Sequence, residues 1–185
     1  MIIPEETILR ADELLLRPLW LTSAAEIYEA AIASRREVGQ WLEWCHADYQ
    51  ISETRDFLAT LPEAWARREA FGFSILDAAT NRLLGSVGLN SFHDAHPFCN
   101  LGYWMRTDAT GRGAASRAAR CVAGWALREL GLRRVEIVAA TGNIASQRVA
   151  EKAGAYREGV LRQRLTIKGA PTDAVMFSLV AEDFA

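Results

Sequence analysis

The sequence predicts an α/β protein of the α+β kind, in which helices flank a mixed, mostly antiparallel twisted sheet of about seven strands. Short runs rich in branched and aromatic residues recur between turn residues, which is typical of strands. Two pairs of these runs are close enough to form hairpins. One run is joined to the next by a long helical segment, and such a crossover places its two strands parallel. From the length we expect a single domain over residues 1–185.

The N-terminal part is expected to hold one strand and two helices. Residues 14–19 read as a strand that ends at the proline of its Arg-Pro pair. Ser23 and Glu26 have the spacing of a capping box, which predicts a helix start just after Ser23. A second helix is expected over residues 52–68 with Ser52 as its N-cap, and Pro62 should kink or divide it.

The remaining strands follow in order along the chain. The first two should form a hairpin, the third should pair antiparallel with the second, and the last two should form a final hairpin. The expected strands are residues 70–76, 83–89, 100–106, 133–140, 161–167 and 174–180.

The stretch from Leu101 to Leu130 organises the chain. A strand-like run leads into a glycine loop at residues 111–116, and apolar residues then recur at helical spacing from Ala115. The first turn of a helix has unpaired backbone N–H groups and a partial positive charge, and glycine lets a phosphate approach the backbone. The loop therefore predicts an anion site suited to phosphate or pyrophosphate. A tight strand-to-helix turn with surface arginines is the other interpretation.

Two familiar phosphate-binding patterns fit poorly. No lysine follows the glycines, as a kinase or ATPase P-loop requires. The dinucleotide pattern is met by Gly111, Gly113 and Ser116, but the next strand ends in residues 139–141, Ala-Ala-Thr. Because that strand end carries no acidic side chain for a ribose, dinucleotide binding is disfavoured.

A third pattern fits more of the chain. The spacing Thr110-x-x-Gly113-x-Ala115 resembles the acetyl-CoA loop of the GNAT superfamily of N-acetyltransferases, whose first position is usually Gln or Arg. Residues 102–105 and 143–154 are similar to the branch that acetylates the N-termini of ribosomal proteins. The resemblance covers nearly the whole chain. It implies a GNAT fold, in which two parallel strands splay apart below the loop and bind the pantetheine arm with their unpaired backbone groups.

The resemblance also implies a set of site residues. Ser146 is the candidate proton donor to the leaving thiolate, because Ala150 stands where many branches have a tyrosine. An ordinary serine in the first turn of a helix is the other interpretation of Ser146. A backbone amide of residues 103–105 would stabilise the thioester carbonyl oxygen. The cofactor-binding residues so implied are Met105, Arg106, Gly111, Arg112, Gly113, Ala114, Ala115, Ser116 and Asn143.

The acceptor side is expected near Trp41 and Trp44, which bracket a short polar stretch. Large aromatic side chains line ligand clefts well, although a hydrophobic plug between two helices explains them equally. Family members carry a similar stretch over the acceptor site, which favours substrate binding. His93 is a further candidate for a contact with the substrate or for proton transfer. His93 and His96 could be read as a metal-binding pair, but no third ligand stands at a credible spacing, so a metal site is disfavoured. By residue type, the candidates for a general base are Glu43, Asp48, Glu69 and His93.

Composition limits the partners and the compartment. A net charge of −2 gives no overall field for nucleic acid. Cys45, Cys99 and Cys121 form no metal pattern and no disulfide framework, which suits a reducing compartment. The start of the chain lacks the features of a signal peptide, and no run approaches the roughly 20 apolar residues of a membrane helix. We therefore expect a cytoplasmic protein with no direct nucleic-acid partner, no membrane partner and no metal.

The resemblance implies an acetyl-CoA-dependent N-acetyltransferase that moves an acetyl group to a primary amine by direct attack on the thioester. The acceptor would be the N-terminal α-amine of a protein or peptide, with ribosomal proteins among the candidates, or a small-molecule amine. The alternative is a CoA-binding regulatory or interaction module without turnover. A monomer or a homodimer is expected.

Overall fold

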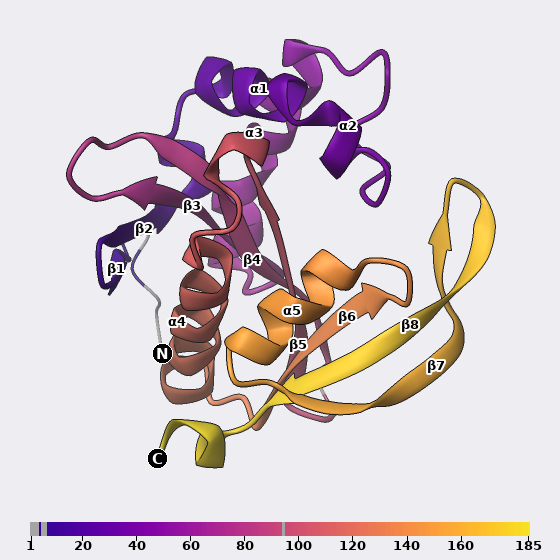
Figure 1. Ribbon diagram of the computed structural model, residues 1–185. Helices are drawn as coiled ribbons and strands as arrows, with labels where there is room; N and C mark the ends of the chain where they lie inside the picture. The colour runs from indigo at the N-terminus through magenta and orange to yellow at the C-terminus, as the bar shows by residue number, and fades with distance from the viewer. Residues whose placement is uncertain (1–3, 5–6, 94) are drawn as a thin grey trace.

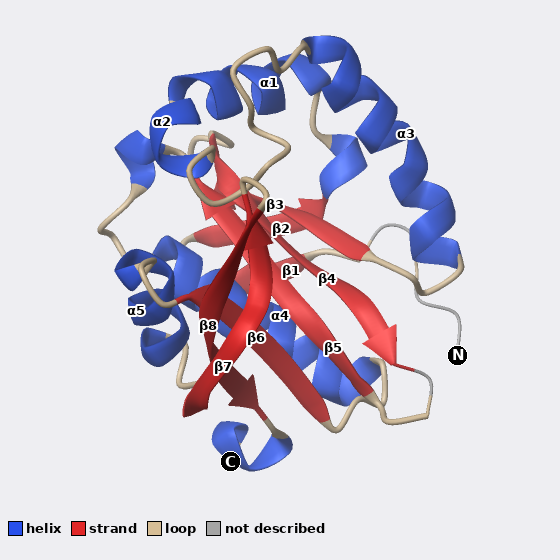
Figure 2. Ribbon diagram, turned by 90° about the vertical axis from the view of Figure 1, so that its right-hand side faces the viewer, coloured by secondary structure: helices blue, strands red, loops and turns tan. Residues whose placement is uncertain are grey.

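The computed structural model describes residue 4, residues 7–93 and residues 95–185. Within them, one eight-stranded sheet has the strand order β1-β2-β3-β4-β5-β6-β8-β7, and helices cover both of its faces (Figures 1 and 2). The strands are β1 (Leu9–Ala11), β2 (Leu14–Pro18), β3 (Phe71–Asp77), β4 (Leu83–His93), β5 (Phe98–Met105), β6 (Arg134–Ala140), β7 (Tyr156–Ile167) and β8 (Ala170–Leu179). The helices are α1 (Ala24–Ala33), α2 (Arg35–Val38), α3 (Ile51–Ala66), α4 (Ala114–Glu129) and α5 (Ile144–Lys152), with short 3-10 turns η1 (Leu19–Leu21), η2 (Thr107–Ala109) and η3 (Ala181–Phe184).

The predicted mixed sheet is confirmed, and it has one strand more than expected, the short edge strand β1. The predicted hairpins and the antiparallel pairing of β4 with β5 are present. The capping box of α1 is also present, because Ser23 Oγ accepts the backbone N–H of Glu26.

Helix α3 differs from the prediction in two ways. Gln50, not Ser52, is its N-cap, and the Glu53 carboxylate accepts the backbone N–H of Gln50. The helix also continues through Pro62, so the proline does not divide it. Tertiary packing of Leu58, Leu61 and Trp65 holds the two parts of the helix together, since all three side chains are buried.

The two faces of the sheet are covered by different helices. Phe73 of β3 contacts Trp125 of α4, with the ring centroids 5.4 Å apart. The neighbouring Gly72 points the other way, where an added Cβ would meet Leu61 of α3. Because successive strand residues face opposite sides, α4 and α3 lie on opposite faces.

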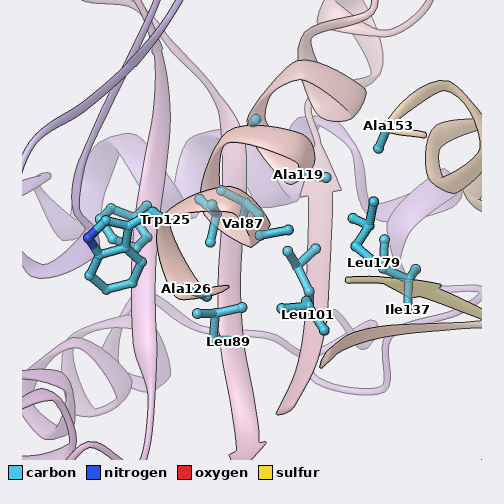
Figure 3. Close-up of a cluster of buried hydrophobic side chains, with 14 of the residues drawn as sticks. Val87, Leu89, Leu101, Ala119, Trp125, Ala126, Ile137, Ala153 and Leu179 are labelled. Atoms are coloured by element: carbon cyan, nitrogen blue, oxygen red, sulfur yellow. The ribbon is translucent and has the colours of Figure 1, made fainter. Parts of the chain in front are cut away.

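Helix α4 lies close to the sheet because its inner face is made of small residues. Ala119 and Ala126 are fully buried and lie over Val87, Leu89 and Leu101 of β4 and β5 (Figure 3). The close approach fixes the position of the N-terminus of α4 relative to β5, which matters for the site described below.

Strands β5 and β6 are parallel, as predicted, but they pair only over a short length. Phe98, Cys99 and Asn100 pair with the start of β6, from Arg134 to Glu136. Beyond this point β5 continues along β4 and β6 continues along β8, so the two strands separate. The splayed pair that the family resemblance implied is therefore present.

The described residues contain no helix that is both long and apolar enough to cross a membrane.

Replacing Trp125 by Ala should destabilise the protein strongly. The side chain is 6% exposed and packs against Trp65, Phe71 and Phe73, so its loss leaves a large cavity. We expect a decrease of about 3–5 kcal/mol in the free energy of unfolding, measured by urea denaturation. The control is Phe57→Ala at a side chain that is 52% exposed, where we expect a change below about 1 kcal/mol. Equal effects of the two substitutions would contradict this account of the core.

Candidate active site

A cavity of about 780 Å³ opens where β5 and β6 separate. Its walls come from both strands, Asn90 of β4, the loop before α4, the first turn of α4, helix α5 with its N-cap, residues 37–38 and 40–42, and residues 165–167 of β7. Leu101 and Tyr103 of β5 belong to the face covered by α4, whereas Gly102 and Trp104 belong to the opposite face. Since all four line the cavity, it reaches both faces of the sheet.

The N-terminus of α4 forms one end of the cavity. Its N-cap is Gly113, with φ of 75°, and Gly111 before it has φ of 79°. Glycine is favoured at such angles, and Gly113 offers no side chain to cap the helix. The first N–H groups of α4 therefore remain available to an anion, with the helix dipole behind them.

The loop before α4 is braced by Thr110. Its hydroxyl donates to the carbonyl oxygen of Thr107 over 2.8 Å, across the η2 turn. Thr110 stands where the family usually has Gln or Arg, and this hydrogen bond fixes the loop without the longer side chain.

Three arginines around the loop, Arg106, Arg117 and Arg120, have partners within the protein. Arg117 pairs with Glu13 at 2.6 Å, and Arg106 pairs with Asp108 at 3.1 Å. Arg120 donates to the carbonyl oxygens of Ala153 and Asp183 and therefore ties α4 to the C-terminal part of the chain. These guanidinium groups support the scaffold.

Two cations that the sequence reasoning missed do line the cavity. Arg148 and Lys152 of α5 lie on its wall. Their i, i+4 spacing places both side chains on one face of α5, and this spacing is the signal that could have found them. They give the cavity positive charge at a second helix.

The start of α5 faces β5 across the opening. Asn143 is the N-cap of α5, as predicted, and its Oδ1 accepts the backbone N–H of Ser146 over 3.1 Å. The Tyr103 hydroxyl donates to the carbonyl oxygen of Ser146 over 2.8 Å and lies 3.1 Å from Ser146 Oγ. Burial raises the pKa of Tyr103 to about 12, against the opposing effect of its hydrogen bond with Ser146. The tyrosine is therefore protonated throughout the physiological range.

The opposite face of the sheet supplies polar side chains from β4 and β5. Asn100 Nδ2 donates to Asn90 Oδ1 over 3.1 Å, and both residues line the cavity. Among the described residues that line it, Glu37 is the only carboxylate, and it accepts a hydrogen bond from Thr107 Oγ1 over 3.0 Å. None of these three was a candidate from the sequence.

The stretch from Trp41 to His46 contacts the far side of the opening. Trp41 lines the cavity, and its ring lies 3.4 Å from the position of a Cβ added to Gly142, in the loop after β6. The Glu43 carboxylate accepts the backbone N–H of Lys168, in the β7–β8 turn, over 3.0 Å. Two loops from distant parts of the chain therefore meet this stretch beside the cavity.

Most of the predicted site residues meet at the cavity, and four do not. Those that line it are Trp41, Met105, Gly111, Gly113, Ala114, Ala115, Ser116, Asn143 and Ser146. Trp44 instead packs on Trp104 and Tyr49, with ring centroids 5.6 and 5.4 Å apart. Arg106 and Arg112 lie outside the lining.

His93 is the fourth residue that the structure does not bring to the cavity. Its ring stacks on those of His96 and Phe98, at centroid distances of 5.0 Å in both cases. His93 is the last residue of β4, three residues beyond Asn90, the β4 residue that lines the opening. The expectation that His93 touches the substrate therefore has no support from its position.

The sheet that splays beside an uncapped helix N-terminus, with a serine of the next helix facing the opening, defines an acetyltransferase of the GNAT class. A comparison with protein families agrees: residues 13–156 match the model of the acetyltransferase (GNAT) domain. The chain therefore belongs to the GNAT family, whose members transfer an acetyl group from acetyl-CoA to an amino group. The resemblance predicted from the loop and the 143–154 segment is confirmed.

Comparisons with individual proteins agree with the family. The chain is 29% identical over 178 residues to the "Probable N-acetyltransferase YjcK" of Bacillus subtilis, covering 95% of this chain and 98% of that protein. It is 28% identical to a solved "putative ribosomal-protein-serine acetyltransferase" from Vibrio cholerae, with a TM-score of 0.78 and coverage of 96% of this chain and 99% of that one. The microcin C7 self-immunity acetyltransferase MccE, solved in complex with acetyl-CoA and AMP, has the same fold at 21% identity, with a TM-score of 0.85 and coverage of 97% and 98%.

Replacing Gly113 by Glu should abolish CoA binding. The substitution adds a carboxylate at the proposed anion site and forces an L side chain into φ of 75°, with its Cβ 3.2 Å from the Arg117 guanidinium. We expect a loss of about 100-fold or more in CoA affinity by isothermal titration calorimetry. Gly169→Glu is the matched control, because Gly169 also has φ of 75° but lies in open space at the β7–β8 turn. The control should bind CoA within about twofold of wild type; the same loss in both variants would assign the effect to backbone strain.

Proposed function

We propose that the cavity binds acetyl-CoA and that the protein transfers its acetyl group to the N-terminal α-amine of a protein or peptide. The diphosphate would lie at the N–H groups of residues 113–116, with Arg148 and Lys152 adding positive charge nearby. The pantetheine arm would lie between β5 and β6. The acceptor would enter from the face that carries Asn90, Asn100 and Trp104.

The observation that carries this proposal is the opening between the two parallel strands. From Gly102 to Met105, and from Ile137 to Ala140, neither strand pairs with the other. Backbone N–H and C=O groups that have left a sheet ladder need other partners. The amide groups of a pantetheine arm are such partners, and the length of the arm suits a cavity that starts at the helix N-terminus and reaches both faces of the sheet.

The transfer needs few groups from the protein. The neutral amine attacks the thioester carbon, and a backbone amide of residues 103–105 would stabilise the carbonyl oxygen as charge develops there. The C–S bond breaks, and Ser146 would donate a hydrogen bond to the leaving sulfur. Asn143 holds the first turn of α5 through the backbone N–H of Ser146, which fixes the backbone of the serine.

The cavity favours an α-amine over a lysine side chain as the acceptor. Glu37 is the only carboxylate among the described lining residues, and its carboxylate already accepts a hydrogen bond from Thr107. An α-amine has a pKa near 8 and is partly neutral at physiological pH, whereas a lysine amine near 10.4 needs a stronger base. The solved relative from Vibrio cholerae, named for a ribosomal-protein-serine acetyltransferase, points to the same kind of acceptor.

The function is tested by supplying acetyl-CoA with a panel of amines and measuring free CoA. The panel contains peptides with N-terminal Ala, Ser, Thr and Met, the same peptides blocked at the N-terminus but carrying a lysine, and spermidine. We expect release of CoA with at least one free N-terminus and at least about tenfold slower release with the lysine peptides, because fewer lysine amines are neutral. CoA binding without release for any amine would instead identify a binding module without turnover.

The pH dependence of the reaction should follow the acceptor. With an α-amine acceptor, kcat/KM should rise about tenfold per pH unit below pH 7 and level off above about pH 8, as the amine loses its proton. No decrease should follow up to pH 9.5, because burial raises the pKa of Tyr103 to about 12 and this hydroxyl keeps its proton. A rate that already levels off near pH 6 would indicate a base within the protein and contradict this account.

A further inference from the structure

Ser146 and Ser116 occupy the same position in two helices but have different hydrogen bonds. Each is the third residue of its helix, after Asn143 as N-cap in α5 and Gly113 as N-cap in α4. Ser116 Oγ donates to the carbonyl oxygen of Gly113 over 2.9 Å, the usual local bond of a serine in a helix. Ser146 Oγ instead faces the Tyr103 hydroxyl at 3.1 Å. A partner from another element therefore holds Ser146 where a helical serine would otherwise bond within its own turn.

Tyr103 reaches Ser146 across the opening. It lies on β5 three residues beyond Asn100, the last β5 residue that pairs with β6. Ser146 lies in the first turn of α5, which follows β6. Both side chains line the cavity, so the pair spans the gap between the two splayed strands.

The hydroxyl of Tyr103 has one proton and two neighbours on the same serine. When it donates to the carbonyl oxygen of Ser146, at 2.8 Å, its own lone pair can accept from Ser146 Oγ. When it donates to Ser146 Oγ, the serine proton is released toward the cavity. In both arrangements Ser146 Oγ stays at one place on the cavity wall.

We propose that Tyr103 is a positioning residue that holds the Ser146 hydroxyl in the cavity, as a hydrogen-bond donor to the sulfur that leaves acetyl-CoA. This inference rests on the proposed function. Many GNAT branches carry a tyrosine on the helix that corresponds to α5, at the position that Ala150 occupies here. In this chain the tyrosine hydroxyl near the leaving sulfur would come from Tyr103 on β5 instead.

The step balances without a further reactant. The C–N bond forms, the C–S bond breaks, and the electron pair of the C–S bond goes to the sulfur. The amine nitrogen loses one proton and the sulfur gains one, so the products are the amide and free CoA. Ser146 donates to the sulfur as negative charge develops, and Tyr103 donates to Ser146 Oγ at the same time. Because burial raises the pKa of Tyr103 to about 12, the tyrosine keeps its proton and acts through the serine.

Tyr103→Phe tests the proposal, because it keeps the ring and removes only the hydroxyl. With acetyl-CoA and the peptide of the panel that gives the fastest CoA release, we expect kcat to fall about tenfold and KM for acetyl-CoA to change less than about twofold. Tyr49→Phe is the matched control. Tyr49 is 5% exposed, its hydroxyl accepts from Thr54 Oγ1 over 2.8 Å, and it lies outside the cavity lining. The Tyr49→Phe variant should keep the wild-type kcat, even if its melting temperature falls as much as that of the Tyr103→Phe variant.

The double variant separates positioning from a purely structural role. If Tyr103 acts through the serine, Tyr103→Phe should change kcat less than about twofold in a protein that already carries Ser146→Ala. Independent, multiplying losses in the double variant would overturn the proposal, and so would a Tyr103→Phe variant with the wild-type kcat. If the wild-type protein releases no CoA with any amine, the proposed function fails and this inference fails with it. If the wild-type protein turns over but the losses multiply, or Tyr103→Phe keeps the wild-type kcat, only the positioning role of Tyr103 is refuted.

Discussion

The early end of pairing between β5 and β6 is the constraint on which the rest of the site depends. The two strands share a ladder only from Phe98 to Asn100 and then follow different neighbours, β4 on one side and β8 on the other. A sheet normally satisfies every backbone group of its inner strands, and unpaired groups in a protein interior are costly. Here the unpaired groups border a cavity, where a ligand with amide groups can satisfy them.

The packing of α4 fixes one end of that opening. Its buried alanines bring the helix close to β4 and β5, and its uncapped N-terminus follows the C-terminal end of β5, where β5 and β6 no longer pair. Two arginines of α4 hold the helix in this position. Arg117 binds Glu13, and Arg120 binds the carbonyl oxygens of Ala153 and Asp183, so the helix is tied to both ends of the chain. The charge available to a ligand comes from the helix dipole and from α5 instead.

Three contacts cross the opening and fix the position of its two sides relative to each other. Tyr103 bonds to Ser146, Trp41 lies against Gly142, and Glu43 accepts the backbone N–H of Lys168. Each joins an element of the β4–β5 side to one of the β6–β8 side, where the sheet itself provides no hydrogen bonds. The site is thus held by side chains at the point where the backbone ladder is missing, and its geometry depends on them.

The sequence by itself determined much of the local structure: the order of the seven longer strands, the N-caps Ser23 and Asn143, and the glycine loop with its helix start. These features depend on residues a few positions apart, so spacing reveals them. Only the tertiary structure decided which candidates meet. Ser146 gained a partner 43 residues away, and His93 stacks on His96 outside the cavity lining. The direction of a side chain on a strand and the partner of a charge depend on contacts between distant segments, which no local pattern encodes.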